Sequence, residues 1–207
     1  MSEDERQMIN GAKLFVKELM ESRLPNGFHY HNLQHTYDVL EHAETIGKYE
    51  GLSDKEFTLL RLGALFHDVG YVDCYEGHEE AGTKYVTEFM KRNGFHMQEI
   101  DRVNMAIRAT KVPQSPIDSV SRILCDADLF YLSDPDDYFQ QAEKLRKEWQ
   151  ARGVRSLGVD EFHENSLEFF NFHRYHTLYG KSVLMDGKAK VAEMIRDKLS
   201  KSPKGSD

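Results

Sequence analysis

The chain has 207 residues, of which 40% are hydrophobic, and it carries a formal net charge of −8 at pH 7. A chain of this length buries about 70% of its unfolded surface, which suffices for one domain with a hydrophobic core. No apolar stretch approaches the ~20 residues that span a bilayer, and the acidic start of the chain is unlike a secretory signal. We therefore expect neither a membrane protein nor a secreted one.

The two cysteines, Cys74 and Cys125, are too few for a disulfide framework and form no Cys-x-x-Cys pair. Reduced thiols and a cytoplasmic location are the simpler interpretation. Apart from a short basic run at 198–204, Lys and Arg are not clustered, which argues against nucleic-acid binding because such affinity depends on clustered cations. A small phosphorylated substrate remains compatible with the negative charge, since a bound divalent cation dominates the field of an acidic pocket.

Apolar residues recur at helical spacing along almost the whole chain. The spacing predicts a first helix around 9–19 and a second over 32–48, followed by a third that a capping box at Ser53 opens and Gly70 ends. We find no period-two alternation longer than four residues and no internal repeat. Further helices are predicted around 81–90, 98–108, 117–127, 138–149, 162–175 and 184–199.

These elements predict an all-α, single-domain bundle of about eight or nine helices over residues 1–200. Residues 201–207 are small and polar, so we expect a disordered tail. The aromatic segment 162–179 is predicted to pack in the core because most of its aromatic side chains follow helical spacing. A wall of a substrate pocket or a dimer face is the alternative for this segment, and a homodimer stays open.

The dipeptide His67-Asp68 stands at the end of the apolar run 59–70 and is the strongest functional signal in the sequence. Two other apolar segments carry matching groups, with His35 in Tyr30-His31-Asn32-Leu33-Gln34-His35 and Asp128 in Leu124-Cys125-Asp126-Ala127-Asp128-Leu129. One His, a His-Asp pair and one Asp from three helices form a mixed nitrogen and oxygen ligand set for a divalent metal.

The second predicted helix concentrates polar groups on one face. His31, His35, Asp38 and His42 are spaced 4, 3 and 4 apart and so share this face. Asp38 is near enough in sequence to orient an imidazole by accepting its second ring hydrogen.

Taken singly, these residues also have structural interpretations. His42 could be a solvated helix residue, His35 a satisfied core histidine, and His67-Asp68 a hydrogen-bonded pair at a helix end. Their co-occurrence with Asp128 favours a metal centre, because three buried polar clusters would each need separate partners.

The order His35, His67-Asp68 and Asp128 resembles the HD-domain superfamily of metal-dependent phosphohydrolases. The resemblance covers residues 27–132 and implies a metal held by His35, His67, Asp68 and Asp128. It also implies hydrolysis by a metal-activated water that Asp68 helps to orient or deprotonate.

The segment Tyr30-His31-Asn32-x-x-His35 resembles the corresponding motif of cyclic-nucleotide phosphodiesterases, a branch of the same superfamily. In that branch the first histidine protonates the leaving oxygen and the second binds metal. The resemblance therefore implies that His31 is the general acid and His35 a metal ligand. It also favours Asp128 over Asp126 as the carboxylate ligand.

Binuclear branches of the superfamily supply further histidines after the His-Asp pair. His78 opens a predicted helix and is a candidate ligand for a second metal, with an exposed helix terminus as the alternative. Arg108, Thr110 and Lys111 stand where another histidine is expected. Arg108 and Lys111 are the candidate cations for substrate phosphate, and a solvated helix end favoured by the macrodipole is the alternative.

The resemblance implies a metal-dependent phosphohydrolase that cleaves a phosphoester of a nucleotide or related small metabolite. The ligand set suits Mn²⁺, Fe²⁺, Co²⁺, Ni²⁺ or Zn²⁺, and Mg²⁺ also stays open. The expected partner is a small phosphorylated molecule, without nucleic acid or membrane. Three alternatives remain: a cyclic-nucleotide or dinucleotide phosphodiesterase with a binuclear centre, a di-iron oxygenase-like redox protein, and a non-catalytic nucleotide-sensing module.

Overall fold

Helices form all of the regular structure in residues 2–202, the part of the chain that the computed structural model describes. The predicted all-α fold is confirmed, with nine α-helices and three short turns of other helix types in this range. None of these helices combines the length and apolarity that a membrane span requires. The elements are α1 (Glu3–Arg23), α2 (Leu33–Glu50), α3 (Asp54–Phe66), η1 (Val69–Val72), α4 (His78–Arg92), α5 (Met97–Ala109), α6 (Ser119–Asp128), η2 (Phe130–Ser133), α7 (Tyr138–Ala151), α8 (Val159–Phe172), η3 (Gly180–Leu184) and α9 (Met185–Lys201).

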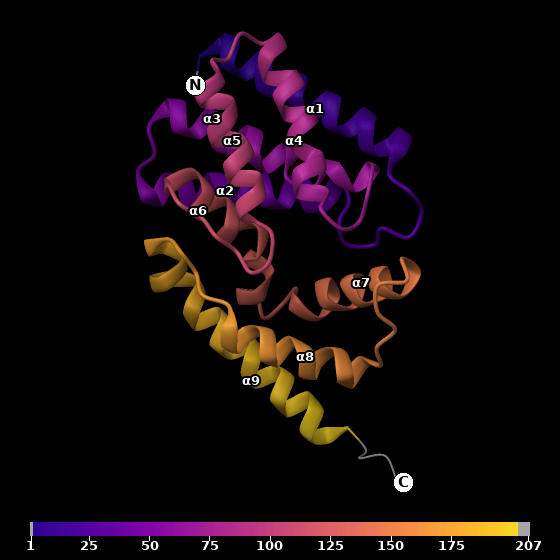
Figure 1. Ribbon diagram of the computed structural model, residues 1–207. Coiled ribbons are helices and arrows are strands. Elements are labelled where there is room, and N and C mark those ends of the chain that lie inside the picture. The colour runs from indigo at the N-terminus through magenta and orange to yellow at the C-terminus, as the bar shows by residue number, and fades with distance from the viewer. Residues whose placement is uncertain (1, 203–207) are drawn as a thin grey trace.

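The helices gather in two groups, each around its own hydrophobic core. Figure 1 shows α1 to α6 together at the end that carries the N-terminus, and α7 to α9 at the opposite end. One cluster of buried side chains is drawn from α1 to α6, and a second is drawn from η2, α7, α8 and α9. The two groups meet where α6 ends and η2 begins.

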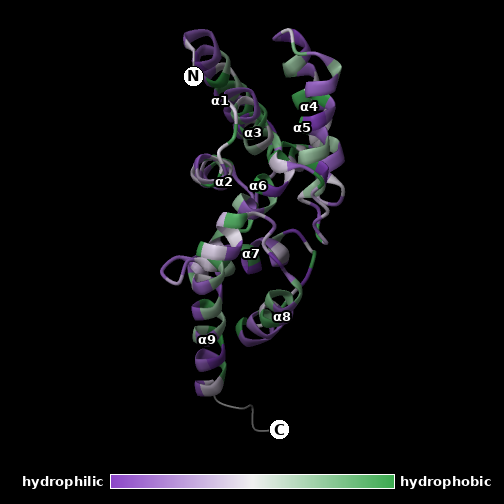
Figure 2. Cartoon of the chain, turned by 90° about the vertical axis from the view of Figure 1, so that its left-hand side faces the viewer, coloured by the Kyte–Doolittle hydropathy of each residue, from purple (hydrophilic) through white to green (hydrophobic). Residues whose placement is uncertain are grey.

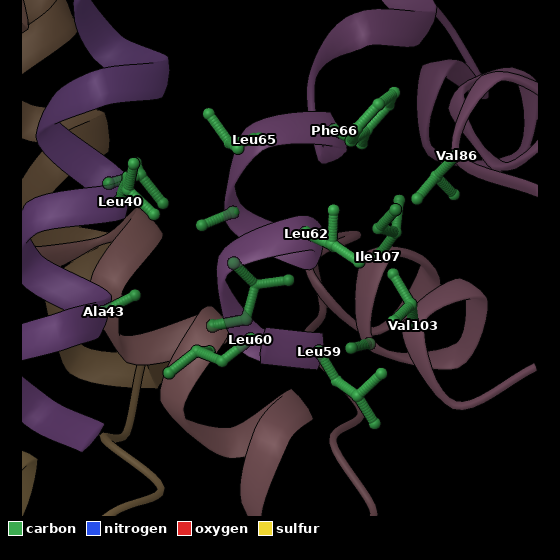
Figure 3. Packing of buried hydrophobic residues seen from close by; sticks show 14 of the residues in the cluster. Leu40, Ala43, Leu59, Leu60, Leu62, Leu65, Phe66, Val86, Val103 and Ile107 are labelled. Atoms are coloured by element: carbon green, nitrogen blue, oxygen red, sulfur yellow. The ribbon is translucent and has the colours of Figure 1, made fainter. Parts of the chain in front are cut away.

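The helix α3 is the centre of the larger core. Its side chains Leu59, Leu62 and Phe66 are buried almost completely. Figure 3 shows α3 between α2 on one side and α4 and α5 on the other. A helix that is apolar on nearly all sides is typical of a protein interior, and each fully buried Leu or Phe contributes about 1.5–3 kcal/mol. The interior position of α3 carries the His-Asp dipeptide at its end to the middle of the molecule.

The smaller core explains much of the aromatic segment. Phe162 and Phe170 of α8 are buried against α7 and α9, as core packing predicts. Phe172, in contrast, is 82% exposed. Figure 2 shows hydrophilic and hydrophobic residues alternating along α9, which therefore offers one apolar face to this core.

Helix boundaries depart from the predicted ones where the chain meets another element. The helix α3 ends at Phe66 rather than at Gly70, and the chain then tightens into the 3₁₀ turn η1. The helix α8 ends at Phe172, where the buried Lys188 Nζ donates to the carbonyl oxygens of Phe170 and His173. The helix α9 continues to Lys201, and residues 203–207 of the expected tail lie outside the described residues.

The predicted capping box at the start of α3 is confirmed and extends into a network of charged groups. Ser53 Oγ accepts from the Glu56 backbone N–H, and the Glu56 carboxylate accepts from the Ser53 backbone. Arg102 Nη2 of α5 donates to Glu56 Oε1 at 2.8 Å, and Ser119 Oγ of α6 donates to the same oxygen at 2.9 Å. One carboxylate thus joins the starts of α3 and α6 to α5.

We expect Glu56→Gln to lower the free energy of unfolding by about 1 kcal/mol at pH 7. The expected loss is small because the side chain is partly exposed and solvent screens its ion pair. Hydrogen bonds from Arg102 and Ser53 lower the pKa of Glu56 from 4.5 to about 2. A carboxyl whose pKa is lowered on folding stabilises the fold above its unfolded pKa, and this stabilisation is lost as the pH falls through the folded pKa. The difference between wild type and variant should therefore shrink between about pH 4.5 and pH 2.

Urea denaturation across this pH range measures the effect. Glu168→Gln is the matched control, because Glu168 is exposed and makes no ion pair within residues 2–202. A difference between wild type and Glu56→Gln that does not depend on pH would contradict the role of the carboxylate charge.

Candidate functional site

Three helix ends bring the predicted metal ligands together. His35 lies in the first turn of α2, His67 and Asp68 follow α3, and Asp128 is the last residue of α6. His35 Nε2 lies 3.2 Å from Asp128 Oδ1 and 3.5 Å from Asp68 Oδ2. His67 Nε2 lies 3.2 Å from Asp68 Oδ2 and 3.6 Å from Asp128 Oδ1. Two imidazole nitrogens and two carboxylates therefore converge on one point.

Local structure fixes how these ligands are presented. Asn32 caps α2, its side chain accepting from the backbone N–H groups of Gln34 and His35. His67 Nδ1 lies 2.8 Å from the Ala64 carbonyl oxygen. Because a carbonyl oxygen can only accept, Nδ1 carries the hydrogen and Nε2 turns a free lone pair toward the cluster. This tautomer is the one that a metal ligand requires.

The cluster fits a divalent cation. His67 Nε2 and Asp68 Oδ2 are both buried, and neither has a hydrogen-bond partner within residues 2–202. Unpartnered buried polar atoms are costly, and a cation between them would satisfy both. The side chains of His67 and Asp68 are 0% and 5% exposed, so bulk water does not replace the cation. The mixed donor set suits Mn, Fe, Co, Ni and Zn alike.

The electrostatics of the cluster keep its carboxylates ionised. Burial alone would raise the pKa of Asp68, but the neighbouring imidazoles, His67 above all, more than offset it and hold the pKa below its ordinary value. Burial also opposes ionisation of Asp128, where the neighbouring imidazoles of His35 and His67 lower the pKa below its ordinary value. Both acids are therefore available as anionic ligands.

His78 stands at the edge of this cluster, at the start of α4. Its side chain is 14% exposed, and its ring stacks on Tyr71 with centroids 3.7 Å apart. Nδ1 donates to the Tyr75 carbonyl at 3.0 Å, which leaves the Nε2 lone pair 3.5 Å from Asp68 Oδ1. The structure thus places His78 beside the second oxygen of Asp68 and not at an exposed helix terminus.

His31 reaches the site from the loop before α2, because the helix begins only at Leu33. Its Nδ1 is hydrogen-bonded to Glu148 Oε1 of α7. Glu148 Oε2 accepts from the backbone N–H groups of Tyr30 and His31 at 2.8 and 2.9 Å. The Glu148 side chain is 0% exposed, so a buried carboxylate holds both the backbone and the imidazole of His31.

The pairing with Glu148 favours the protonated imidazole. Burial lowers the pKa of His31, but the hydrogen bond that it donates to Glu148 and the charge of Asp68 outweigh this effect and raise the pKa above its ordinary value. Burial likewise raises the pKa of Glu148, and the bonds from His31 and the backbone reverse this and lower it. His31 and Glu148 thus form an ion pair. The second ring nitrogen of His31, Nε2, is not engaged by Glu148 and can donate its hydrogen to another group.

Glu148 is the site residue that sequence reasoning missed, since it lies 117 residues from His31. The sequence of α7 nevertheless contains a pattern that indicates a buried role for Glu148. Glu148 follows the predicted core residues Ala142 and Leu145 at three-residue spacing, so it occupies the apolar face of that helix. A carboxylate on an apolar face requires a buried partner.

The two predicted substrate cations are not brought to the cluster. Arg108 Nε donates to Glu80 Oε2 at 2.5 Å, and its Nη2 donates to Glu80 Oε1 at 3.0 Å. Lys111 is exposed. No hydrogen bond or ion pair joins either side chain to the His-Asp cluster within the described chain, and their role in substrate binding remains a prediction.

Other residues singled out in the sequence have separate contacts. Asp38 accepts from Gln34 Nε2 at 2.8 Å, and His42 stacks on Phe130 with ring centroids 3.9 Å apart. Asp126 points away from the cluster and accepts from the backbone N–H groups of His176 and Thr177.

Gly70 sets the distance between the His-Asp dipeptide and α4, which carries His78. A Cβ at position 70 would overlap the His78 carbonyl oxygen and lie 2.6 Å from the Gly82 backbone nitrogen. We expect Gly70→Ala to lower the free energy of unfolding by about 1–3 kcal/mol, as overpacking against backbone does. Gly11→Ala in α1 is the control, because a Cβ there meets nothing within 4 Å. Urea denaturation compares the two, and equal stability of both variants would contradict the close approach.

The chain is similar to one protein family in sequence and to several solved structures in fold. Residues 32–131 match the sequence model of the HD domain family, and no curated protein matches the chain. Bacillus subtilis YpgQ, solved in complex with ADP, is 17% identical to this chain with a TM-score of 0.65. The alignment covers 97% of this chain and 98% of YpgQ. A predicted HD superfamily hydrolase from an uncultured Thermotogales bacterium is 19% identical with a TM-score of 0.57, over 91% of its length and 90% of this chain. A protein from Lactobacillus plantarum is 13% identical with a TM-score of 0.66, over 96% of its length and 94% of this chain.

At these identities the three structures show a shared fold and no more. The match at 32–131 is more informative, because it contains His35, His67, Asp68 and Asp128. His31 and Glu148 lie outside it. Residues 32–131 of this chain are therefore an HD domain.

Proposed function

We propose that this protein is a metal-dependent hydrolase that cleaves a phosphoester of a nucleotide or a related small metabolite. The convergence of His35, His67, Asp68 and Asp128 around unpartnered buried atoms carries this proposal. The HD domain at residues 32–131 supports hydrolysis, as does the fold shared with the Thermotogales protein. The ADP bound to Bacillus subtilis YpgQ supports a phosphorylated ligand.

Each residue of the site has a distinct part in this function. His35, His67, Asp68 and Asp128 would hold the cation. A bound divalent cation polarises the phosphoryl group and makes water acidic near neutral pH. Asp68 is fixed among these groups and orients the water. His31, with Nδ1 engaged by Glu148, uses Nε2–H to protonate the leaving oxygen.

A phosphodiesterase with two metals is the second candidate, and the position of His78 favours it. Asp68 turns Oδ2 toward His35 and His67, and Oδ1 toward His78. A carboxylate with imidazoles on both oxygens can bridge two cations, as in two-metal sites.

Phosphate release from the Mn²⁺-loaded protein tests the proposal. The panel comprises nucleoside mono-, di- and triphosphates, sugar phosphates and cyclic nucleotides, the last read as nucleotide product. Turnover of nucleotide esters that disappears in Asp68→Ala is expected. Turnover confined to cyclic compounds, with two metals bound per chain, would favour the second candidate. Metal binding without turnover of any compound would contradict both and support a sensing module.

A further inference from the structure

A cavity of about 790 Å³ lies outside the candidate metal centre. It is formed by α6 and by the segment that joins α8 to α9, which runs below α6 in Figure 1. Asp128 and Asp126 are two residues apart on α6 and so point about 200° apart. Asp128 faces the metal cluster, and Asp126 binds the segment at the cavity. The cavity and the metal centre therefore lie on different sides of α6.

Positively charged side chains gather at this cavity. Arg122, Arg174 and Lys181 line it together with His176, and none of its lining residues is acidic. Within residues 2–202, Arg122, Arg174 and Lys181 make no ion pair, although the chain has 35 acidic and 27 basic residues. Like charges held together in one cavity repel one another, and an anion between them removes this repulsion.

His176 lines the same cavity as the three cations, and the charges of Lys181 and Arg122 both act on its imidazole. Burial lowers the pKa of His176 first, and the charges of Lys181 and Arg122 lower it further against the opposing effect of Asp126. His176 Nε2 lies 3.1 Å from Gln114 Oε1, while Gln114 Nε2 donates to the Cys125 carbonyl oxygen. The imidazole is thus fixed at the cavity by the loop before α6.

The segment that presents Arg174 and Lys181 is locked in place. Asp126 Oδ2 accepts from the backbone N–H of Thr177 at 2.9 Å and from its hydroxyl at 2.6 Å. Gly180 N–H donates to the same hydroxyl oxygen at 2.8 Å, and a Cβ at Gly180 would overlap the Asp126 carboxylate. Arg174 Nη1 donates to the carbonyl oxygens of Asn171 and His173. Lys181 stands in the π-helix η3, a rare element that is frequent at functional sites.

The cavity suits a ligand with several negative charges close together. Its volume falls within the range of about 300–1,000 Å³ that small-molecule sites occupy. Arginine guanidinium groups match phosphate oxygens in geometry, and three cations exceed what one phosphate group can neutralise. Tyr175 and Met185 add apolar surface to the lining. We propose that this cavity binds an oligophosphate, meaning two or more linked phosphate groups, free or on a nucleotide, at a site separate from the metal centre.

Titration calorimetry on the full chain, treated with chelator and at physiological salt, tests the proposal. Tripolyphosphate, ATP and orthophosphate are the probes. Tripolyphosphate should bind at one site per chain, and Arg122→Gln/Lys181→Gln should weaken it about tenfold or more, since charge-assisted hydrogen bonds are lost. Lys84→Gln/Lys91→Gln is the matched control, because it removes two exposed cations from α4 and should leave the affinity unchanged. Tighter binding of ATP than of tripolyphosphate would identify a nucleotide as the source of the phosphates.

Several results would overturn the proposal. One is that the wild type does not bind tripolyphosphate, or binds it no more tightly than orthophosphate. Another is that the Arg122→Gln/Lys181→Gln variant binds tripolyphosphate as tightly as the wild type does. A single-stranded oligonucleotide that binds more tightly than tripolyphosphate, and is lost in the same variant, would identify a nucleic-acid surface instead. A change of oligomeric state in the variant, without oligophosphate binding to wild type, would show that a second copy of the chain occupies the cavity. Because the chelator removes the metal, none of these results bears on the proposed hydrolase function.

Discussion

Replacing Asp68 by alanine is expected to abolish both metal retention and turnover. Asp68 is the ligand that lies beside three histidines of the site, with Oδ2 3.2 Å from His67 Nε2 and 3.5 Å from His35 Nε2, and Oδ1 3.5 Å from His78 Nε2. Loss of outer-shell partners of a metal typically costs 10–100-fold, and loss of a direct ligand should exceed about 100-fold. Metal content after dialysis and phosphate release from the preferred nucleotide measure the two effects separately.

Asp38→Ala is the matched control for this variant. Asp38 lies on the same helix as His35, but its Oδ1 accepts only from Gln34 Nε2 among the described residues. It should keep metal and activity near wild-type values. Circular dichroism establishes that Asp68→Ala folds, which is expected because removing an unpartnered buried carboxylate relieves a polar cost in the metal-free protein. A folded Asp68→Ala protein that is metal-replete and active would exclude the proposed centre.

The helices were predictable because their signal lies within each segment. The apolar spacing of α3 and the capping box at Ser53 are local patterns, and the structure confirms both. The end of α3 was not predictable in the same way. Gly70 reads as a helix terminator in sequence, yet its place in the fold is decided by the backbone of α4, which approaches where a Cβ would stand. A contact of this kind has no trace in the local pattern.

The residues of the candidate site also differ in whether a local sequence pattern or the fold identifies them. His35, His67-Asp68 and Asp128 were found because each is a polar group in an apolar segment, and a shared ligand explains all of them. Arg108 was assigned to substrate from its place in the sequence alone, whereas the structure pairs it with Glu80. The fold decides which cations form ion pairs, and within residues 2–202 the cations of the cavity beside α6 form none.

The two proposed sites would give a chain of net charge −8 two different means of binding phosphorylated ligands. At the metal centre the positive charge must come from the cation, since Asp68 and Asp128 are anionic. At the cavity beside α6 the chain supplies the positive charge itself, through Arg122, Arg174 and Lys181. Chelation should therefore abolish phosphate binding at the first and spare it at the second.

Replacing His31 by alanine is expected to preserve the metal and slow hydrolysis by ~10²–10⁴-fold, the usual worth of a general acid. The loss should shrink for an ester of p-nitrophenol, because an acidic leaving group needs little protonation. Steady-state kinetics with the preferred substrate and the activated ester compare the two losses. Equal losses for both leaving groups would remove His31 as the acid.

Replacing Glu148 by glutamine tests whether this carboxylate acts through His31. Glutamine keeps an oxygen that can accept from the backbone N–H groups of Tyr30 and His31, but it lacks the charge that stabilises the imidazolium. Glu148→Gln should therefore slow hydrolysis of the unactivated ester more than that of the activated one. Residues that act as a unit show non-additive losses, so His31→Ala/Glu148→Gln should be no slower than His31→Ala alone. Losses that add in the double variant would show that Glu148 contributes to turnover independently of His31.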